Sequence, residues 1–258
     1  MKRIAIVTGA SSGIGKEFFI SLNERKDGLD EIWVIARSED KLNALQELTD
    51  VPVRAFALDL SKSSSFDELS AVLQAETVAV KYLICASGFG RFTAVLDDEK
   101  ETLENMVDLN CRAIVSTTRI VAPYMEKGGL IMLIASVAAF QPIPYVATYG
   151  ATKAFVLSYG RAFNRELLKS HRARCMCVCP FWTKTAFFER AVVEGEPVVK
   201  KYVAMYEPKQ IVAKAWKDAK RKKEFSMFGF KAKAQTFLTK LLPHKLVMSV
   251  WMSQQKLK

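Results

Sequence analysis

The sequence predicts a doubly wound α/β fold, in which a mostly parallel, seven-stranded sheet carries helices on both faces. Two observations predict it. Short runs of apolar, β-branched residues alternate with longer segments of helical periodicity, which is typical of repeated βα units. A glycine-rich turn joins the first apolar run to the first helical segment, as it does in Rossmann-like folds. We therefore expect a Rossmann-like sheet.

The apolar runs mark the strands, and helical periodicity marks the segments between them. We expect strands near residues 3–7, 31–36, 53–58, 80–86, 129–135, 173–179 and 224–229. We expect helices near residues 14–26, 39–49, 63–76, 99–126, 148–171 and 207–221. Parallel strands need such crossover helices between them, which is why the two kinds of segment alternate.

A chain of 258 residues, half of them apolar, is long enough to bury one large core. We expect a single domain over residues 1–258, with a cofactor half over about 1–180 and a basic helical tail over about 231–258. Residues 181–206 break the alternation and combine bulky apolar residues with charges, which predicts a lid over a ligand. A packed helical hairpin is the alternative.

The first residues and the cysteines bear on location. Met1-Lys2-Arg3 leads directly into an apolar strand, which is not the pattern of a secretory signal peptide, and no apolar run approaches the roughly 20 residues of a membrane span. Five cysteines are an odd number, and Cys175, Cys177 and Cys179 alternate as buried strand residues do. We expect a cytoplasmic protein with reduced cysteines and no metal.

The net charge of +11 is unevenly distributed. Residues 1–180 contain 21 basic and 21 acidic residues, whereas residues 181–258 contain 17 and 6. Such a basic end can attract an anionic group on a substrate or an acidic membrane surface. We expect the tail to pack on its own domain or on a second subunit in preference to a membrane. No known nucleic-acid-binding module accompanies the charge, so we expect no nucleic-acid partner.

The glycine-rich turn predicts a dinucleotide site. Glycine lets the backbone turn tightly and approach a pyrophosphate, and the first amides of the following helix donate hydrogen bonds to its oxygens. The predicted cofactor-binding residues of the turn are Gly9, Ser11, Ser12, Gly13, Ile14 and Gly15.

The ends of the next two strands extend this prediction. Arg37 stands where a carboxylate that binds the ribose hydroxyls of NAD often lies, and a guanidinium there suits the 2′-phosphate of NADP. We therefore expect NADP(H) in preference to NAD(H). The alternative is a solvated Arg37 with Glu39 or Asp40 at the ribose. Asp59, followed by Leu60, is expected to accept a hydrogen bond from the adenine, or else to cap the next helix.

Two further segments predict acid–base chemistry. Tyr149 and Lys153 are one helical turn apart, and a nearby ammonium favours the phenolate form of a phenol whose pKa is otherwise about 10. Ser136 follows the strand near 129–135, so its hydroxyl lies at the same sheet edge and can donate to a carbonyl oxygen. Together they suit proton transfer to or from a substrate oxygen.

With the turn Thr8 to Gly15 and the segment Tyr149-Gly150-Ala151-Thr152-Lys153, the chain resembles the short-chain dehydrogenase/reductases over most of residues 3–230. The resemblance implies that Lys153 also holds the nicotinamide ribose and that Thr183 contacts the carboxamide. It implies that Asn110 helps to hold a water that relays protons, although a buried structural amide is the alternative. It also places Ala86, Gly88 and Pro180 at the cofactor, and implies a homodimer or homotetramer formed through the helices near 99–126 and 148–171.

Two departures from the family pattern stand out. Cys85 replaces the usual asparagine after the fourth strand, which removes an amide that braces the cofactor loop. Phe181 replaces the usual glycine after Pro180, which puts a ring beside the nicotinamide or the substrate. We expect the first change to reduce rigidity and the second to narrow the pocket.

The sequence therefore predicts an NADP(H)-dependent oxidoreductase that interconverts a ketone or aldehyde and an alcohol, with Tyr149 as general acid/base. The expected pocket wall is apolar and bulky, and so is the expected substrate. Its members are Phe140, Pro142, Ile143, Pro144, Tyr145, Phe181, Trp182, Phe187 and Phe188. Two alternatives remain open: an NADP(H)-binding regulator without turnover, and a lipid ketoreductase attached to a membrane surface.

Overall fold

Seven parallel strands form one sheet in the order β3-β2-β1-β4-β5-β6-β7, as a computed structural model describes for residues 1–25, 27–170, 173–192 and 198–257. The strands are β1 (Lys2–Thr8), β2 (Glu31–Ala36), β3 (Val53–Ala57), β4 (Val78–Cys85), β5 (Met125–Ile134), β6 (Arg174–Val178) and β7 (Phe225–Ser226). All six strand pairings are parallel. The order reverses beside β1, which is where doubly wound sheets bind their ligands.

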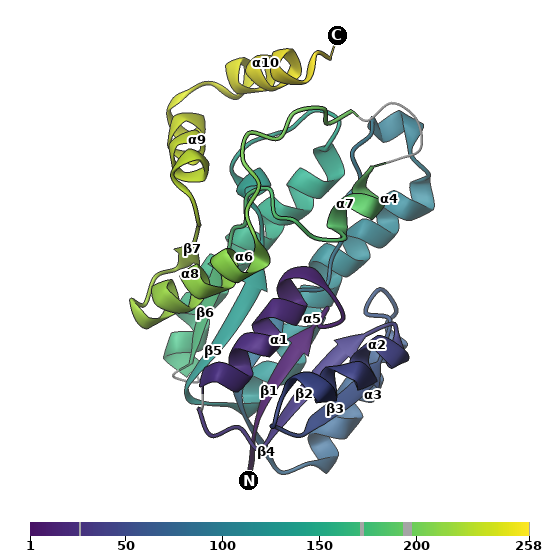
Figure 1. Ribbon diagram of the computed structural model, residues 1–258, viewed down its shortest axis with the longest axis vertical. Helices are drawn as coiled ribbons and strands as arrows, with labels where there is room; N and C mark the ends of the chain where they lie inside the picture. The colour runs from purple at the N-terminus through teal and green to yellow at the C-terminus, as the bar shows by residue number, and fades with distance from the viewer. Residues whose placement is uncertain (26, 171–172, 193–197, 258) are drawn as a thin grey trace.

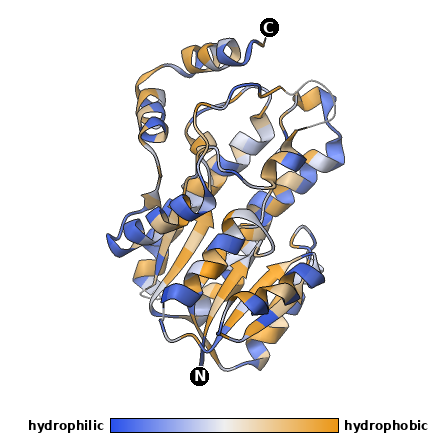
Figure 2. Cartoon of the chain, in the orientation of Figure 1, coloured by the Kyte–Doolittle hydropathy of each residue, from blue (hydrophilic) through white to orange (hydrophobic). Residues whose placement is uncertain are grey.

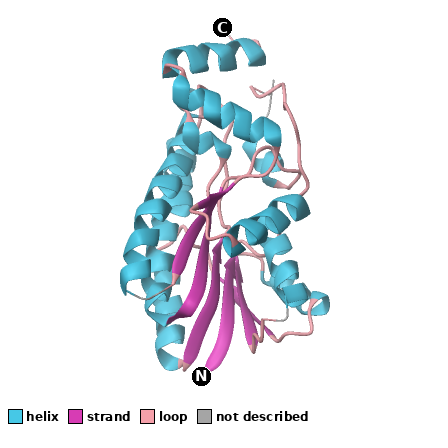
Figure 3. Ribbon diagram, turned by 90° about the vertical axis from the view of Figure 1, so that its left-hand side faces the viewer, coloured by secondary structure: helices cyan, strands magenta, loops and turns pink. Residues whose placement is uncertain are grey.

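Helices cover both faces of the sheet, as Figure 3 shows edge-on. One face carries α1 (Gly13–Arg25), α2 (Glu39–Asn43) and α8 (Pro208–Lys220). The other face carries α3 (Ser64–Ala75), α4 (Lys100–Val107), α5 (Ala113–Val121) and α6 (Ala147–Ser170). The predicted single-domain, doubly wound architecture is therefore confirmed.

Successive side chains of each strand point to opposite faces of the sheet and so belong to two separate apolar layers. Ile4 and Ile6 of β1 pack with the α3, α5 and α6 side, whereas Ala5 and Val7 pack with the α1 and α8 side. Figure 2 shows the strands as hydrophobic and the helices as striped, because each helix buries only one face. Burial on both faces explains why the strands appear in the sequence as continuous apolar runs.

Three predicted elements need correction. The helix expected over 99–126 is interrupted by a π-helical turn at Asp108–Arg112, and β5 already begins at Met125. The helix expected over 39–49 is α2 followed by a 3₁₀ turn at Ala44–Leu48. The strand expected over 224–229 is only Phe225–Ser226, because Gly229, with φ of 93°, turns the chain towards the next helix.

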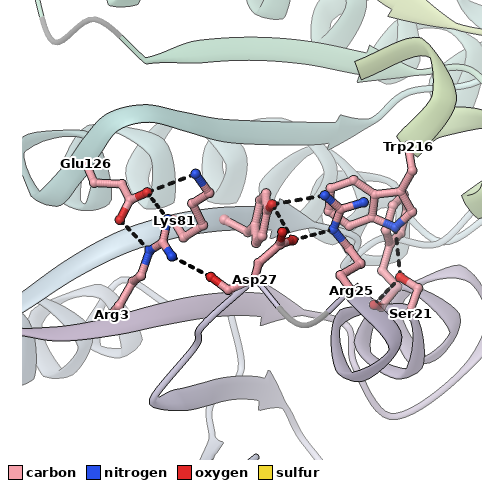
Figure 4. A network of polar contacts seen from close by, with 9 residues as sticks. Arg3, Ser21, Arg25, Asp27, Lys81, Glu126 and Trp216 are labelled. Carbon is pink, nitrogen blue, oxygen red and sulfur yellow. Dashed lines mark hydrogen bonds and ion pairs between the residues drawn. The ribbon is translucent and has the colours of Figure 1, made fainter. Parts of the chain in front are cut away.

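A polar network holds the amino ends of the strands together (Figure 4). Glu126 binds Arg3 at 2.8 Å and Lys81 at 2.9 Å, which joins β1, β4 and β5. Asp27 accepts from Tyr82 Oη at 2.7 Å and from Arg25 Nε at 2.6 Å, and Arg3 also donates to the Asp27 carbonyl. These bonds stabilise one end of the sheet and leave the other end for ligands.

The carboxyl ends of the strands face the described part of residues 181–206 and the tail (Figure 1). Residues 181–206, for which the sequence predicts a lid, contain the short helix α7 (Phe187–Ala191), and 193–197 lie outside the described residues. The tail forms α9 (Phe230–Leu241) and α10 (His244–Gln255), which Pro243 separates. Within the described part of the chain, the helices are too short or too polar to cross a bilayer.

Candidate active site

A cavity of about 440 Å³ opens at the carboxyl ends of the strands, and this volume is within the usual range of ligand sites. The glycine-rich turn after β1 and the residues at the start of α6 line the same space. Among its walls is every predicted site residue except Asn110: Gly9, Ser11, Ser12, Gly13, Ile14, Gly15, Arg37, Asp59, Leu60, Ala86, Gly88, Ser136, Tyr149, Lys153, Pro180 and Thr183.

The glycine-rich turn is packed too tightly for side chains. A Cβ at Gly15 would lie 2.2 Å from the Gly9 carbonyl oxygen, and a Cβ at Gly9 would lie 2.7 Å from the Ser87 nitrogen. Gly9 and Gly13 also have positive φ values of 68° and 55°, which favour glycine. Since α1 begins at Gly13, its first amides lie beside the cavity, and this cradle fits the pyrophosphate of a dinucleotide.

Two cationic side chains lie at the end of β2. The polar residues that line the cavity there, within the described chain, are Arg37, Ser38 and Lys41, and neither Glu39 nor Asp40 is among them. The alternative in which an acidic residue binds the ribose therefore has no support in the geometry. Lys41 was not predicted, because a lysine in a short polar helix gives no sequence pattern that distinguishes it from a solvated one.

Asp59 lies at the end of β3, next to the cavity. Its Oδ1 accepts hydrogen bonds from the nitrogen and the hydroxyl of Ser61, at 3.0 and 2.8 Å. Burial by itself raises the pKa of Asp59, but the bonds from Ser61 and the charge of Arg37 outweigh it and lower this pKa. Asp59 is therefore an ionised acceptor that both supports its own turn and borders the cavity.

The loop after β4 is braced without the family's asparagine. Thr8 Oγ1 accepts hydrogen bonds of 3.2 Å from the amides of Ala86 and Ser87. Cys85 is buried in the sheet below them. The hydroxyl of Thr8 thus ties the loop to the glycine-rich turn, where the sequence led us to expect a loss of rigidity.

Ser136, Tyr149 and Lys153 come together from two elements. Ser136 follows β5, and its Oγ accepts a hydrogen bond of 3.1 Å from the Ala138 amide. Tyr149 and Lys153 stand one turn apart near the start of α6. Lys153 Nζ donates at 2.8 Å to the carbonyl of Ile134, the last residue of β5, so the strand end fixes the lysine.

Burial controls the ionisation of this pair. It raises the pKa of Tyr149 to about 12, and a hydrogen bond with Ser136 opposes the rise. Burial also lowers the pKa of Lys153 to about 8, while Cys111 and Cys179 oppose the fall. Lys153 Nζ lies 5.6 Å from the centre of the Tyr149 ring. The sequence predicts that the ammonium acidifies the phenol, but in the structure the hydroxyl of Ser136 is the group that lowers this pKa.

Asn110 does not line the cavity; it lies behind the cavity in the π-helical turn and is fully buried. Its Oδ1 accepts from the Phe89 amide at 3.1 Å, and its Nδ2 donates to the Phe89 carbonyl at 2.9 Å and to Thr152 Oγ1 at 3.0 Å. A Cβ at Gly88 would lie 2.8 Å from Asn110 Oδ1 and 3.6 Å from Lys153 Nζ. The amide therefore holds the loop after β4 against α6.

The pocket wall is aromatic but differs from the expected set. The expected residues that line it are Ile143, Phe181, Trp182, Phe187 and Phe188. Phe140, Pro142, Pro144 and Tyr145 do not line it, and Phe140 instead packs on Phe225 with ring centres 5.8 Å apart. The reason is that the chain after Ser136 forms a 3₁₀ turn, Val137–Phe140, that directs Phe140 into the core.

Residues distant in sequence complete this wall. Phe92 is buried among Trp182, Phe187 and Phe188, with ring centres 6.0 to 6.3 Å away. Trp251 of α10 also lines the cavity, and its Nε1 donates to the Pro144 carbonyl at 3.0 Å. Neither was predicted for the site, because only tertiary packing brings them there.

Comparisons with known proteins agree with this geometry. A family profile described as short chain dehydrogenase matches residues 3–194. The very-long-chain 3-oxoacyl-CoA reductase of Neurospora crassa is 30% identical over 172 residues, which cover 63% of this chain and 51% of that protein. The protein of the same name from Rattus norvegicus is 31% identical over 191 residues, which cover 70% and 59%. This chain thus spans about half the length of the curated relatives it matches first.

A solved structure extends the similarity to nearly the whole fold. A short-chain dehydrogenase from Sphingobium yanoikuyae in complex with NADPH matches with a TM-score of 0.75 at 26% identity, over 87% of each chain. A dinucleotide is therefore bound by a protein with this arrangement of strands and helices.

Proposed function

This chain belongs to the short-chain dehydrogenase/reductase family, and we propose that it is an NADP(H)-dependent enzyme. The proposed reaction interconverts a ketone, or an aldehyde, and an alcohol on a bulky apolar substrate. One observation carries the proposal: the glycine-rich turn, Ser136, Tyr149 and Lys153 line a single cavity. A protein that only senses the cofactor needs the turn, but it has no use for a phenol proton donor with an ammonium one helical turn away.

The nicotinamide, when bound, supplies or accepts the hydride. In the reductive direction Tyr149 donates its proton to the carbonyl oxygen, since a phenol with a pKa of about 12 is protonated at neutral pH. Ser136 donates a hydrogen bond to the same oxygen as negative charge develops on it. The same hydroxyl of Ser136 lowers the pKa of Tyr149, and we propose that the positive charge of Lys153, 5.6 Å from the centre of the Tyr149 ring, adds to this by attracting the phenolate once it forms.

Asn110 serves this site as a positioning residue. Its hydrogen bonds to Phe89 and Thr152 fix the loop and the helical turn that flank Lys153. We assign it the place beside the proton path from Lys153 to solvent that the family resemblance implies.

The preference for NADP(H) rests on charge. Arg37 and Lys41 line the end of the cavity next to β2, together with the hydroxyl of Ser38. Two cations and a hydroxyl suit the 2′-phosphate of NADP and offer no carboxylate to the free ribose hydroxyls of NAD. The NADPH bound by the Sphingobium yanoikuyae relative supports this preference.

The substrate proposed is a long or bulky apolar ketone, of which a 3-oxoacyl chain is one example. The wall formed by Phe92, Phe181, Trp182, Phe187 and Trp251 supports an apolar substrate. Matches to very-long-chain 3-oxoacyl-CoA reductases support an acyl chain. The lid segment 181–206 supplies three of these rings, and we propose that it closes over the bound chain.

We further propose a homodimer or homotetramer built on α4, α5 and α6. Val107, Val115, Phe155 and Leu168 of these helices are exposed, and such apolar residues are often covered in an assembly. The cytoplasmic location expected from the sequence also stays a prediction; the cysteines of the chain are free and buried, as reducing surroundings would keep them.

The test is NADPH oxidation against a panel of carbonyl compounds graded in size, from acetone to a 3-oxoacyl-CoA with a long chain. The proposal predicts turnover that rises with apolar size and is faster with NADPH than with NADH. Binding of NADPH, followed by fluorescence, without turnover of any member of the panel would instead support a regulator.

A further inference from the structure

Helix α9 has a buried inner face and an exposed apolar outer face. Its inner face, with Ala232, Thr236 and Thr239, is buried on the domain. Its outer face carries Phe230, 84% exposed, and Leu241, 65% exposed, which are separated by three helical turns. Because this outer face points away from the packed face, no other part of the described chain covers it.

The outer apolar face has lysines on both sides. Phe230, Phe237 and Leu241 follow the i, i+7, i+11 spacing of one helix face. Lys231 lies to one side of this stripe, and Lys233 lies to the other side. An apolar stripe flanked by lysines is the pattern of a helix that lies in the interface of a membrane.

The apolar surface continues past Pro243. Leu238 of α9, Leu242 between the helices, and Leu246 and Val250 of α10 are between 38% and 52% exposed. The opposite face of α10 buries Val247 and Trp251. Figure 1 shows the two helices as one extension beyond the carboxyl ends of the strands. We call the residues Phe230, Phe237, Leu238, Leu241, Leu242, Leu246 and Val250 the tail surface.

A basic groove borders the tail surface. It lies between the end of α8, β7 and α9, and Phe237 belongs to both the groove and the tail surface. Lys222, Lys233 and Lys240 line it, and none of the three has a carboxylate within ion-pair distance among the described residues. The two carboxylates of the groove, Asp218 and Glu224, form ion pairs with other basic residues. Ammonium groups without a carboxylate partner, beside an apolar surface, fit the phosphate and carboxylate groups of lipid headgroups.

Charge decides which partner covers the tail surface. A second copy of this chain that covered the tail surface through a twofold axis would bring Lys231, Lys233 and Lys240 of one copy close to the same lysines of the other, and like charges in contact oppose association. The excess of 17 basic over 6 acidic residues in 181–258 also makes this end of one copy repel the same end of another. An anionic bilayer instead neutralises the lysines and buries the apolar side chains at once.

We propose that α9 and α10 dock this protein on an anionic lipid bilayer, with the tail surface in the headgroup–acyl boundary and the lysines of the groove on the headgroups. The same helices reach the cavity, since Gln235 of α9 and Trp251 and Gln254 of α10 line it. Docking therefore brings the cavity close to the bilayer, from which an apolar molecule can be taken up without crossing water. The docking itself is independent of the reaction proposed above.

The test is flotation of the full-length chain with vesicles of phosphatidylcholine alone or mixed with phosphatidylserine. We expect binding to the mixed vesicles, about tenfold weaker in Phe237→Ser/Leu241→Ser and in Lys233→Glu/Lys240→Glu. Leu96→Ser removes a leucine that is 96% exposed elsewhere, and Lys127→Glu/Lys169→Glu makes the same charge change at the other end of the sheet. Both controls should bind as the unaltered chain does, and all variants should keep their circular dichroism and NADPH affinity.

Three results would overturn the proposal. The first is no flotation with the mixed vesicles. The second is flotation that the Phe237→Ser/Leu241→Ser variant leaves unchanged. The third is a dimer, measured by light scattering without lipid, that the same double variant dissociates, because a second copy of the chain would then be the occupant of the tail surface.

Discussion

A buried hydrogen bond of 3.0 Å joins Asn110 Nδ2 in the π-helical turn to Thr152 Oγ1 on α6. Thr152 Oγ1 in turn donates to the Tyr149 carbonyl at 2.8 Å, and Lys153 is the next residue. A π-helical turn adds one residue to a helix locally, and such turns are frequent at functional sites. Here it presents an amide to the helical turn that carries both Tyr149 and Lys153.

Removing this amide should weaken the fold and the site together. In Asn110→Ala the Phe89 amide and carbonyl lose their partner, so we expect the free energy of unfolding to fall by about 1–3 kcal/mol, with a lower kcat and a smaller effect on KM. Denaturant unfolding measures the free energy of unfolding, and steady-state kinetics measure kcat and KM. Thr152→Val removes the acceptor of this bond and also the hydrogen bond from Thr152 Oγ1 to the Tyr149 carbonyl. A double-mutant cycle isolates the shared bond and should give a coupling of about 0.5–3 kcal/mol between the two sites. Additive effects would refute the coupling.

Reversing the charge at Arg37 should change the cofactor preference. A carboxylate repels the 2′-phosphate and accepts hydrogen bonds from ribose hydroxyls, so Arg37→Asp should raise KM for NADPH at least about tenfold and leave KM for NADH similar or lower. Initial rates with each cofactor at a fixed ketone concentration measure this. Glu39→Gln is a matched control at a neighbouring position that does not line the cavity. Equal effects of Arg37→Asp on both cofactors would remove the assignment to NADP(H).

The pH profile should report Lys153. Its pKa is lowered to about 8, so the ammonium is present below that pH and is lost as the pH rises through it, whereas Tyr149, with a pKa of about 12, keeps its proton. We expect kcat/KM for ketone reduction to be constant near neutral pH and to fall above about 8. In Lys153→Arg the positive charge persists at higher pH, so the residual kcat/KM of this variant should stay constant where that of the unaltered chain falls. An unchanged decline in that variant would show that another group titrates.

The ring at Phe181 should restrict the pocket. Phe181→Ala removes a side chain from the cavity wall, so kcat/KM for bulky ketones should rise relative to small ones by about 10-fold or more, the usual effect of changing the volume of an apolar pocket. Phe140→Ala removes a ring of the same size that packs on Phe225 outside the cavity. It should lower the melting temperature without changing this ratio. The prediction fails if Phe181→Ala and Phe140→Ala change the ratio of kcat/KM between bulky and small ketones to the same extent.

The sequence predicted the parts of the site that depend on local rules. A strand followed by Gly9, Gly13 and Gly15 specifies a turn and the start of a helix, and two residues four apart on a helix share a face. Both relationships involve neighbouring residues only, so periodicity and spacing are enough to find them.

The remaining features depend on tertiary packing. The π-helical turn leaves the helical periodicity of 99–126 almost unchanged, so periodicity did not reveal it. Trp251 reaches the cavity only because α10 folds back over Pro144. The high pKa of Tyr149 comes from burial, which outweighs the hydrogen bond with Ser136.

The role of Tyr149 is tested most directly by the rate of NADPH oxidation with a ketone substrate in Tyr149→Phe, measured beside the NADPH dissociation constant of the same variant. The ring and its packing on Phe187 remain, and only the proton donor is lost. General acid catalysis usually raises the rate about 100- to 10,000-fold, so we expect kcat to fall by at least about 100-fold. The NADPH dissociation constant should stay within about threefold of the unaltered value. Turnover that persists in Tyr149→Phe at the unaltered rate would contradict the proposed mechanism.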